Sequence, residues 1–450
     1  MLSTNKKGLL KHSSNFLHVP HHTMLPIFSR NFIKAENINS SKSSLQSLQC
    51  NAEMGDINSM VDYGKKLIHK DEKTACNYFK KAADRGNLEA ASLYASLIKK
   101  EYIKIQKNHS SSFSKIEESN LKNELLKYLK ISADSGNSVS QMEYADFLIE
   151  NPSQYYQALS YYKKSANQKN IEAADKLILF DFFSPQSNEI PKCNGISRRS
   201  QLLLLLSENY NEQSFNELKK IGDDGDIYAT LSTTMIIAKA KPETAQEIIQ
   251  SLENVKFEPA NSLKKLISSF IYSTLGKEHE SFKLMKEAAD SGFIIAKYFI
   301  SFFYLNAPFE KKDQELALEA IKFAYENGME NARLVYAKFL HDGIGCHPDP
   351  KKVIEILKNV KRNENERYIY NSSLMKLQKY EELLVSLKEG MEEKDSNCFY
   401  LYGMMKMNGI GVPLDKESGV EMLQKAATMG NEQAMSEIAA TQFDDKVKCT

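Results

Sequence analysis

The chain contains no tryptophan, and its six cysteines are scattered over 450 residues without a short recurring spacing. Extracellular repeat scaffolds are expected to carry paired cysteines, so this usage favours a reducing compartment. Long apolar runs are missing too, because the longest, near 293–305, contains Lys297 and falls short of the roughly 20 residues that cross a bilayer. No transmembrane helix and no direct membrane insertion are therefore expected.

An excess of charge of either sign is also absent. The 59 Lys and Arg residues are balanced by 58 Asp and Glu residues, which leaves a net charge of +1. No global field draws this chain to nucleic acid or to an anionic membrane, so no nucleic-acid partner is expected. With 42% apolar residues, the chain is well able to bury a core.

Motifs for catalysis or cofactor binding are equally scarce. The Gly-Ile-Gly segments 343–345 and 409–411 lack the preceding strand and the third glycine of a dinucleotide site, and are interpreted as loops. Cys346 and His347 resemble a nucleophile and its base only in composition, because adjacent side chains rarely point at one another.

A cluster of histidines near the N-terminus has spacing that could hold a metal if the backbone were ordered. No cysteine lies near it, and we interpret the cluster as incidental; it consists of His18, His21 and His22. The sequence therefore predicts a non-enzymatic protein with no catalytic residue, no cofactor and no metal site.

A short cassette, in contrast, returns nine times. Its clearest copies read Lys-Lys-Ala-Ala-Asp-Arg-Gly-Asn-Leu-Glu-Ala at 80–90 and Lys-Glu-Ala-Ala-Asp-Ser-Gly-Phe-Ile-Ile-Ala at 286–296. A helix that ends on Ala-Ala-x-x-Gly predicts a tight helical hairpin, and repeated hairpins stack into a solenoid. Gly suits the turn because it enters the left-handed region without steric cost. The nine turn positions, here called anchors, are Gly55, Gly86, Gly136, Lys169, Gly225, Gly292, Gly328, Lys394 and Gly430.

Small side chains flank these anchors, four residues before in most copies and four residues after in all. Small residues let two helix backbones approach closely, and larger ones would overpack the crossing at a cost of roughly 1–3 kcal/mol each. Tyrosines eight residues from an anchor, such as Tyr63 and Tyr94, are predicted to wedge between hairpins. Lys169 and Lys394 should strain or alter their turns. The residues four after the anchors are Ser59, Ala90, Ser140, Ala173, Ala229, Ala296, Ala332, Cys398 and Ala434.

These residues resemble the Sel-one-like repeat family, a relative of the tetratricopeptide repeat. The match is best at 75–94, at 343–345 and at 409–434, although Tyr78 stands where Trp is common. The resemblance covers about 48–440 and is weak from 181 to 285. It implies an all-α fold, a right-handed α-solenoid of stacked antiparallel helical hairpins.

The spacing of the anchors predicts the domain organisation. Two intervals, of 66 and 67 residues, nearly equal two units and predict degenerate repeats near 259–276 and 363–378. The polar segment 106–120 is expected to be a mobile loop. The expected parts are a disordered or targeting-like tail at 1–47, N-terminal repeats at 48–183, a hinge or insertion at 184–199, degenerate helical repeats at 200–285, C-terminal repeats at 286–440 and a tail at 441–450.

The resemblance implies an adaptor or scaffold that binds a protein or peptide on the concave face of the solenoid. Polar residues just after the turns are the candidate partner-binding residues, although the sequence does not decide which helix face is concave. An adaptor in ER-associated protein degradation and a regulatory subunit of a signalling enzyme such as a kinase remain alternatives, and the oligomeric state stays open. The candidates are Asn87, Glu89, Asn331 and Glu432.

The N-terminal segment 1–35 contains no acidic residue, which loosely suits an organelle transit peptide. Pro20 and Pro26 interrupt any compact apolar core of a secretory signal. We interpret the segment as a disordered tail of a cytoplasmic protein, with organelle import as the alternative.

Overall fold

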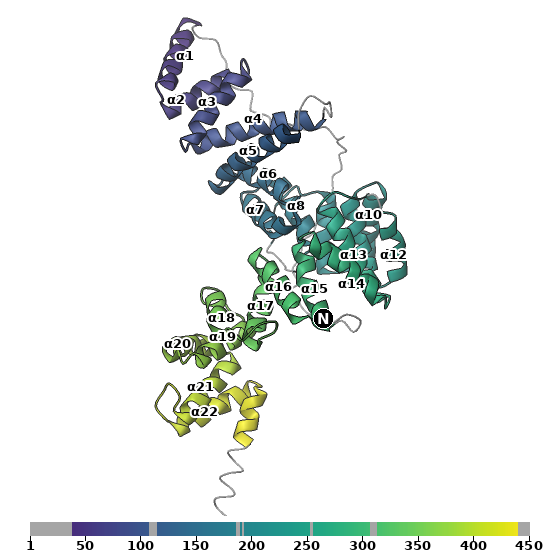
Figure 1. Ribbon diagram of the computed structural model, residues 1–450, viewed down its shortest axis with the longest axis vertical. Coiled ribbons are helices and arrows are strands. Elements are labelled where there is room, and N and C mark those ends of the chain that lie inside the picture. The colour runs from purple at the N-terminus through teal and green to yellow at the C-terminus, as the bar shows by residue number, and fades with distance from the viewer. Residues whose placement is uncertain are drawn as a thin grey trace, which may run out of the picture.

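The computed structural model is built entirely from helices within the part that it describes. Twenty-two α-helices, one short 3-10 helix and a last helical stretch at 432–439 follow one another without a strand in this part, which confirms the predicted all-α class (Figure 1). The described residues are 38–107, 115–185, 190, 193–252, 255–306 and 313–439.

The helices are mostly 11–16 residues long, and α4 and α5 are longer. The first half contains α1 (Ile38–Glu53), α2 (Ile57–Leu67), α3 (Glu72–Asp84), α4 (Leu88–Lys107), α5 (Lys115–Asp134), α6 (Ser138–Leu148), η1 (Pro152–Gln154), α7 (Tyr155–Asn167), α8 (Ile171–Asp181), α9 (Arg198–Glu208) and α10 (Glu212–Asp223). The second half contains α11 (Ile227–Ile237), α12 (Pro242–Gln250), α13 (Ala260–Thr274), α14 (Glu278–Asp290), α15 (Ile294–Asn306), α16 (Gln314–Glu326), α17 (Glu330–Asp342), α18 (Pro350–Leu357), α19 (Glu364–Lys376), α20 (Tyr380–Glu392), α21 (Ser396–Asn408) and α22 (Lys416–Thr428).

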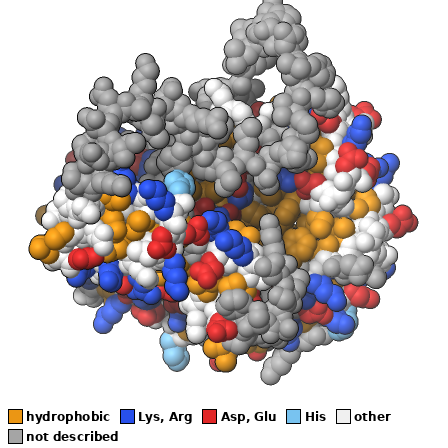
Figure 2. Space-filling view, turned by 90° about the horizontal axis from the view of Figure 1, so that it is seen from above, with side chains coloured by type: hydrophobic (Ala, Val, Ile, Leu, Met, Phe, Trp, Pro, Cys, Tyr) orange, Lys and Arg blue, Asp and Glu red, His pale blue; other side chains and the backbone are white. Residues whose placement is uncertain are grey.

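Consecutive helices pack against one another, and the hairpins stack into an elongated, winding rod with α1 and α22 near opposite ends (Figure 1). The rod winds back on itself, because the rings of Tyr155 at the start of α7 and Phe293 before α15 meet edge to face with centroids 5.5 Å apart. Viewed along the rod, the face in Figure 2 has a hollow in which hydrophobic side chains gather between charged ones. The α-solenoid expected from the sequence is thus confirmed.

The anchors adopt the backbone conformation that the cassette predicts. At Gly86, for example, φ is 89°, and the Asn87 N–H donates to the Ala82 carbonyl at 3.0 Å, the hydrogen bond of a Schellman cap. Lys169 and Lys394 also lie in the left-handed region, at φ 66° and 63°. These two turns are therefore strained rather than altered.

The residue after the anchor usually caps the next helix. The Asn87 Oδ1 accepts the Ala90 N–H at 2.8 Å, which satisfies one of the free donors at the start of α4. The cap residue, one after the anchor, thus accepts the backbone N–H of the small residue that stands four after the same anchor. The same cap is made by Asp56, Asn137, Asn170, Asp226 and Asn431.

The small side chains lie at the crossings of the helices, as predicted. Ala90, Ala296 and Ala332 are fully buried. A Cβ added to Gly390, four residues before an anchor, would lie only 2.3 Å from the Sγ of Cys398, four residues after it. The two flanking positions therefore face each other across the hairpin, with no room for a larger residue.

The tyrosines eight residues from the anchors join neighbouring hairpins, which confirms the predicted wedges. In two pairs the hydroxyl also donates to an aspartate two residues before the preceding anchor, from Tyr128 to Asp84 and from Tyr161 to Asp134. The rings meet edge to face in the pairs Tyr63–Tyr78, Tyr94–Tyr128 and Tyr144–Tyr161, with centroids 5.2, 4.7 and 5.0 Å apart.

Two expectations about segment ends differ from the structure. Helix α1 begins at Ile38, ahead of the solenoid start expected at 48. The segment 106–120, expected to be a loop, is helical at both ends, because α4 reaches Lys107 and α5 begins at Lys115; residues 108–114 lie outside the described part. Polar residues are compatible with an exposed helix, so polarity alone misidentified this segment.

Candidate protein-binding site

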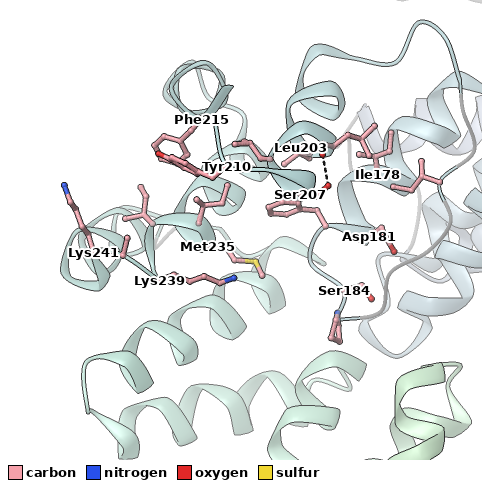
Figure 3. Close-up of a pocket in the computed structure, with 18 residues that line it drawn as sticks. Ile178, Asp181, Ser184, Leu203, Ser207, Tyr210, Phe215, Met235, Lys239 and Lys241 are labelled. Carbon is pink, nitrogen blue, oxygen red and sulfur yellow. Dashed lines mark hydrogen bonds between the residues drawn. The ribbon is translucent and has the colours of Figure 1, made fainter. Parts of the chain in front are cut away.

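An open pocket lies in the middle of the rod, between α8, α9 and α11. Its volume is about 1090 Å³, and its walls are mainly apolar (Figure 3). Residues from the α9–α10 hairpin face the end of α11 across it. The apolar walls include Leu203, Leu204, Leu206, Tyr210, Phe215 and Met235.

A run of five leucines in α9 supplies one apolar wall of the pocket. Leu202 and Leu203 are fully buried in the core, whereas Leu204 and Leu206 are half-buried and line the pocket. Successive helical residues point about 100° apart, so five consecutive leucines cover more of the helix than one packed face needs. The surplus apolar face of α9 therefore remains open, and Leu205 beside it is 48% exposed.

Charged groups stand at the rim of the pocket rather than inside it. Lys239 and Lys241 lie on the side of α11 and α12, and Asp181 and Ser184 lie on the opposite side (Figure 3). Both lysines are exposed, and neither makes an ion pair with another described residue. The arrangement suits a ligand that is apolar in the middle and negatively charged at one end.

Two of the four predicted partner-binding residues lie together at the anchor before α4. Asn87 caps that helix through Ala90, as described above. The carboxylate of Glu89 lies 2.7 Å from the ammonium of Lys65 in α2. Both side chains thus have roles inside the solenoid, and their contact with a partner stays a prediction.

The other two predicted residues lie in different places. Asn331 donates from its side-chain amide to the carbonyl of Pro185 at 3.1 Å, across 146 residues of sequence, and Pro185 lines the large pocket. Glu432 is exposed and lines a separate, smaller pocket of about 370 Å³ with Tyr368 and Asn397. The four residues are not assembled into one site.

Sequence reasoning missed the pocket itself, although two signals were present. The interval of 56 residues between Lys169 and Gly225 matches neither one unit nor two, and the leucine run 202–206 exceeds what one packed face requires. The sequence predicts a hinge or insertion at 184–199, and we infer no pocket from either signal.

One constellation in the described part matches the order of a catalytic triad. His341 Nδ1 lies 2.7 Å from Asp342, and its Nε2 lies 3.0 Å from the hydroxyl of Ser372. Ser372 stands inside α19, where the backbone N–H groups are used by the helix and supply no oxyanion hole. The cluster therefore joins α17 to α19 and lacks the donors that acyl transfer needs.

The loop between α17 and α18 has structural roles. A Cβ on Gly345 would lie 2.1 Å from the Gln314 carbonyl oxygen, so glycine is needed for close backbone approach. Burial raises the pKa of the Cys346 thiol, which keeps it protonated at neutral pH and disfavours a nucleophilic role. The interpretation of 343–345 as a loop is confirmed.

Metal and membrane features were also sought among the described residues. No group of three or more His, Cys, Asp or Glu side chains there is placed to hold a metal ion. No helix in the described ranges combines the length and the apolar character that crossing a membrane requires. The histidine cluster and the acid-free segment 1–35 lie outside the described part.

Comparison with known proteins found similar solved structures at low sequence identity. No curated protein matches the chain. Similar solved structures include c5321, a protective antigen of uropathogenic Escherichia coli displaying an SLR fold (14% identity, 88% of this chain and 81% of that chain covered, TM-score 0.40). Others are a Sel1 repeat protein from Oxalobacter formigenes (16%, 93% and 98%, TM-score 0.25) and a human IFIT1 dimer with PPP-AAAA (13%, 88% and 96%, TM-score 0.38).

The family model of the Sel1 repeat matches three segments, residues 49–87, 150–170 and 400–431. Each of the three ends one residue after an anchor, at Gly86, Lys169 or Gly430. The matches thus follow the register that the cassette and the left-handed turns establish. The chain therefore carries Sel1 repeats at these three segments.

Proposed function

We propose that this protein is a non-enzymatic adaptor that binds a segment of a partner protein, with the pocket between α8, α9 and α11 as its main docking site. The observation that carries the proposal is the open apolar wall of that pocket. Tyr210 is 66% exposed beside it and Leu205 48% exposed. Exposed apolar surface of this kind marks interaction sites, because its burial is favourable by about 25 cal/mol per Å².

The geometry favours a protein segment over a small molecule. The pocket is a groove bounded by four helices, and a groove between helices suits a chain that lays side chains along it. Asn331 is the predicted partner-binding residue nearest to this site, since it holds the carbonyl of Pro185 at the edge. An adaptor in ER-associated protein degradation and a regulatory subunit of a signalling enzyme such as a kinase remain the alternatives. The proposed location is the cytoplasm, with organelle import as its alternative.

Site-specific cross-linking tests the proposal. A photoreactive phenylalanine analogue at Tyr210 in the full chain, expressed in cells, should form covalent adducts with a defined partner protein. The control places the same analogue at Leu414, which is 61% exposed and lies outside the pocket. Equal adducts at both positions, or adducts at neither, would contradict the proposed docking site.

A further inference from the structure

The number of α-helices between anchors is even everywhere in the described part except around the pocket. One unit of 36 residues, from Gly292 to Gly328, contains two helices, α15 and α16. Two intervals of 66 and 67 residues contain four helices each. The interval of 56 residues from Lys169 to Gly225 contains only three, α8, α9 and α10. It is shorter than two units by about the length of one helix.

Here a helix that follows an anchor is called a first helix, and one that precedes an anchor a second helix. The contacts of α9 identify it as a first helix. Arg199 in its first turn pairs with Asp226, the cap of the first helix α11, so the two helices start side by side. The Ser197 N–H donates to Asp175 of the first helix α8 at 2.8 Å. Because α9 pairs with α10 as a hairpin, α8 is the helix without a second helix.

Between α8 and α9, the described residues 182–185, 190 and 193–197 are not helical. The sequence of this connector carries Pro185 and Pro191, which disfavour a continuous helix. Gly195 has a φ of 90°, and Ser197 caps α9, so a left-handed turn precedes α9 as it precedes other first helices. Cys193 packs back toward α7, with its Sγ 3.6 Å from the Ala166 carbonyl.

The remaining space has the size of a short helix. A helix about 10 Å in diameter with a pitch of 5.4 Å fills about 420 Å³ per turn. The pocket of about 1090 Å³ therefore has room for two to three turns.

The lysines at the rim indicate the chemistry of the occupant. A second helix runs antiparallel to the first helices, so its start would lie beside the end of α11, where Lys239 and Lys241 stand. Second helices of this chain commonly carry acid in their first turn, and Lys100 of α4 pairs with such an acid in α3. The first-turn acids are Glu72, Glu117, Glu212, Glu243, Glu278, Glu315, Glu381 and Glu417.

We infer that the pocket is the vacant place of one second helix, and that a partner protein fills it with an amphipathic helix of two to three turns. The apolar face of that helix packs on α9 and α11, and Asp or Glu in its first turn meets Lys239 and Lys241. This inference rests on the proposed function and specifies the partner segment. The acid-free segment 1–35 lacks the charge for this role.

Selection from a library of helix-biased peptides of about 11 residues, which is three helical turns, tests the inference on the full chain. Enriched peptides should combine an apolar stripe with acid in the first turn. The double variant Lys239→Glu and Lys241→Glu should weaken them about tenfold, and peptides with Lys in the first turn should bind that variant better. The double variant Lys283→Glu and Lys388→Glu, both exposed outside the pocket, is the control and should change nothing.

The outcomes separate the inference from the proposed function. Enriched peptides that bind at Tyr210 but ignore the charge reversal overturn the inference and leave the adaptor role standing. Enrichment of extended, non-helical sequences does the same. If nothing binds at Tyr210, both fail.

A graft tests the vacancy without any ligand. Residues 186–194 are replaced by the sequence of α16 with its cap and turn, residues 313–328, and a flexible Gly-Ser insert of equal length is the control. The graft should add helix by circular dichroism, raise Tm above that of the control and abolish peptide binding. A Tm below that of the Gly-Ser control would show that the place does not accept a helix and would overturn the inference.

Discussion

The hairpin of α21 and α22 and the junction of α8 and α9 show opposite solutions to the same packing problem. In the hairpin, a Cβ on Gly403 would lie 3.0 Å from the Gly419 carbonyl oxygen, so the two backbones nearly touch. At the junction, the walls stand apart around about 1090 Å³. In the regular units, the apolar faces of neighbouring helices pack against each other. In the interrupted unit, part of the apolar surface stays open and is available to a partner.

The largest expected difference between the two regions concerns buried charge. Arg367 lies 3.0 Å from Asp395, whose side chain is 2% exposed, at the cap of α21. Arg367→Ala should lower the free energy of unfolding by about 3–5 kcal/mol, because the carboxylate loses its partner inside the protein. Urea denaturation followed by circular dichroism measures it.

Lys239→Ala at the rim of the pocket is the matched control for that variant. An exposed charge without an ion-pair partner should change stability by less than about 0.5 kcal/mol. Comparable losses in both variants would show that the junction is as tightly constrained as the regular stack, and would remove the contrast.

Small residues should be required for stability only where two helices pack closely against each other. Ala288, four residues before an anchor, is fully buried, and Ala288→Leu should cost about 1–3 kcal/mol through overpacking. Ser207 lines the pocket and is exposed, so Ser207→Leu should be nearly neutral there. Thermal unfolding of the two variants makes the comparison. A destabilising Ser207→Leu would argue that the pocket is already filled.

The strained turns supply a smaller effect of the opposite sign. Lys169→Gly or Lys394→Gly should stabilise by about 0.5–1 kcal/mol, because relief of about 1–2 kcal/mol of left-handed strain exceeds the added chain entropy of glycine. The reverse change, Gly86→Lys, should cost about 1–2 kcal/mol, since nothing lies within 4 Å and only the backbone conformation matters. Equal stability of Lys169→Gly and the natural chain would mean that the turn relaxes without cost.

The solenoid was predictable because its code is local. Anchors, small flanking residues and tyrosine wedges recur at fixed offsets. Each has one structural role, and that role can be recognised from its position in a single sequence. The hidden repeats near 259–276 and 363–378 were likewise found from spacing, and α13 and α19 stand there.

The candidate site was not predictable in the same way, because it arises from something missing. No sequence motif marks the place of a missing helix. The leucine run 202–206 has the composition of an ordinary core helix, and only the structure shows that no second helix covers it. Among the polar residues chosen after the turns, Asn87 is the cap of α4, which its offset of one residue from the anchor could have indicated.

The smallest expected effect is a pH dependence confined to the links between regular hairpins. The hydrogen bond from the Tyr128 hydroxyl lowers the pKa of the Asp84 carboxyl below its ordinary value, while partial burial opposes this. A carboxyl whose folded pKa is depressed stabilises the fold above its unfolded pKa of about 3.9, and this stability is lost as pH falls through the folded pKa. Asp84 is 45% exposed, so the contribution is below about 1 kcal/mol.

Tyr128→Phe should therefore be less stable than the natural chain at pH 7, and the gap should narrow as the pH falls below about 4. Urea denaturation at a series of pH values measures the gap. Tyr210→Phe is the control, because that ring lies 66% exposed at the junction and no described residue accepts a hydrogen bond from it. A constant gap for Tyr128→Phe would show that its hydroxyl stabilises by packing alone, and a pH-dependent gap for Tyr210→Phe would place an unrecognised carboxylate at the pocket.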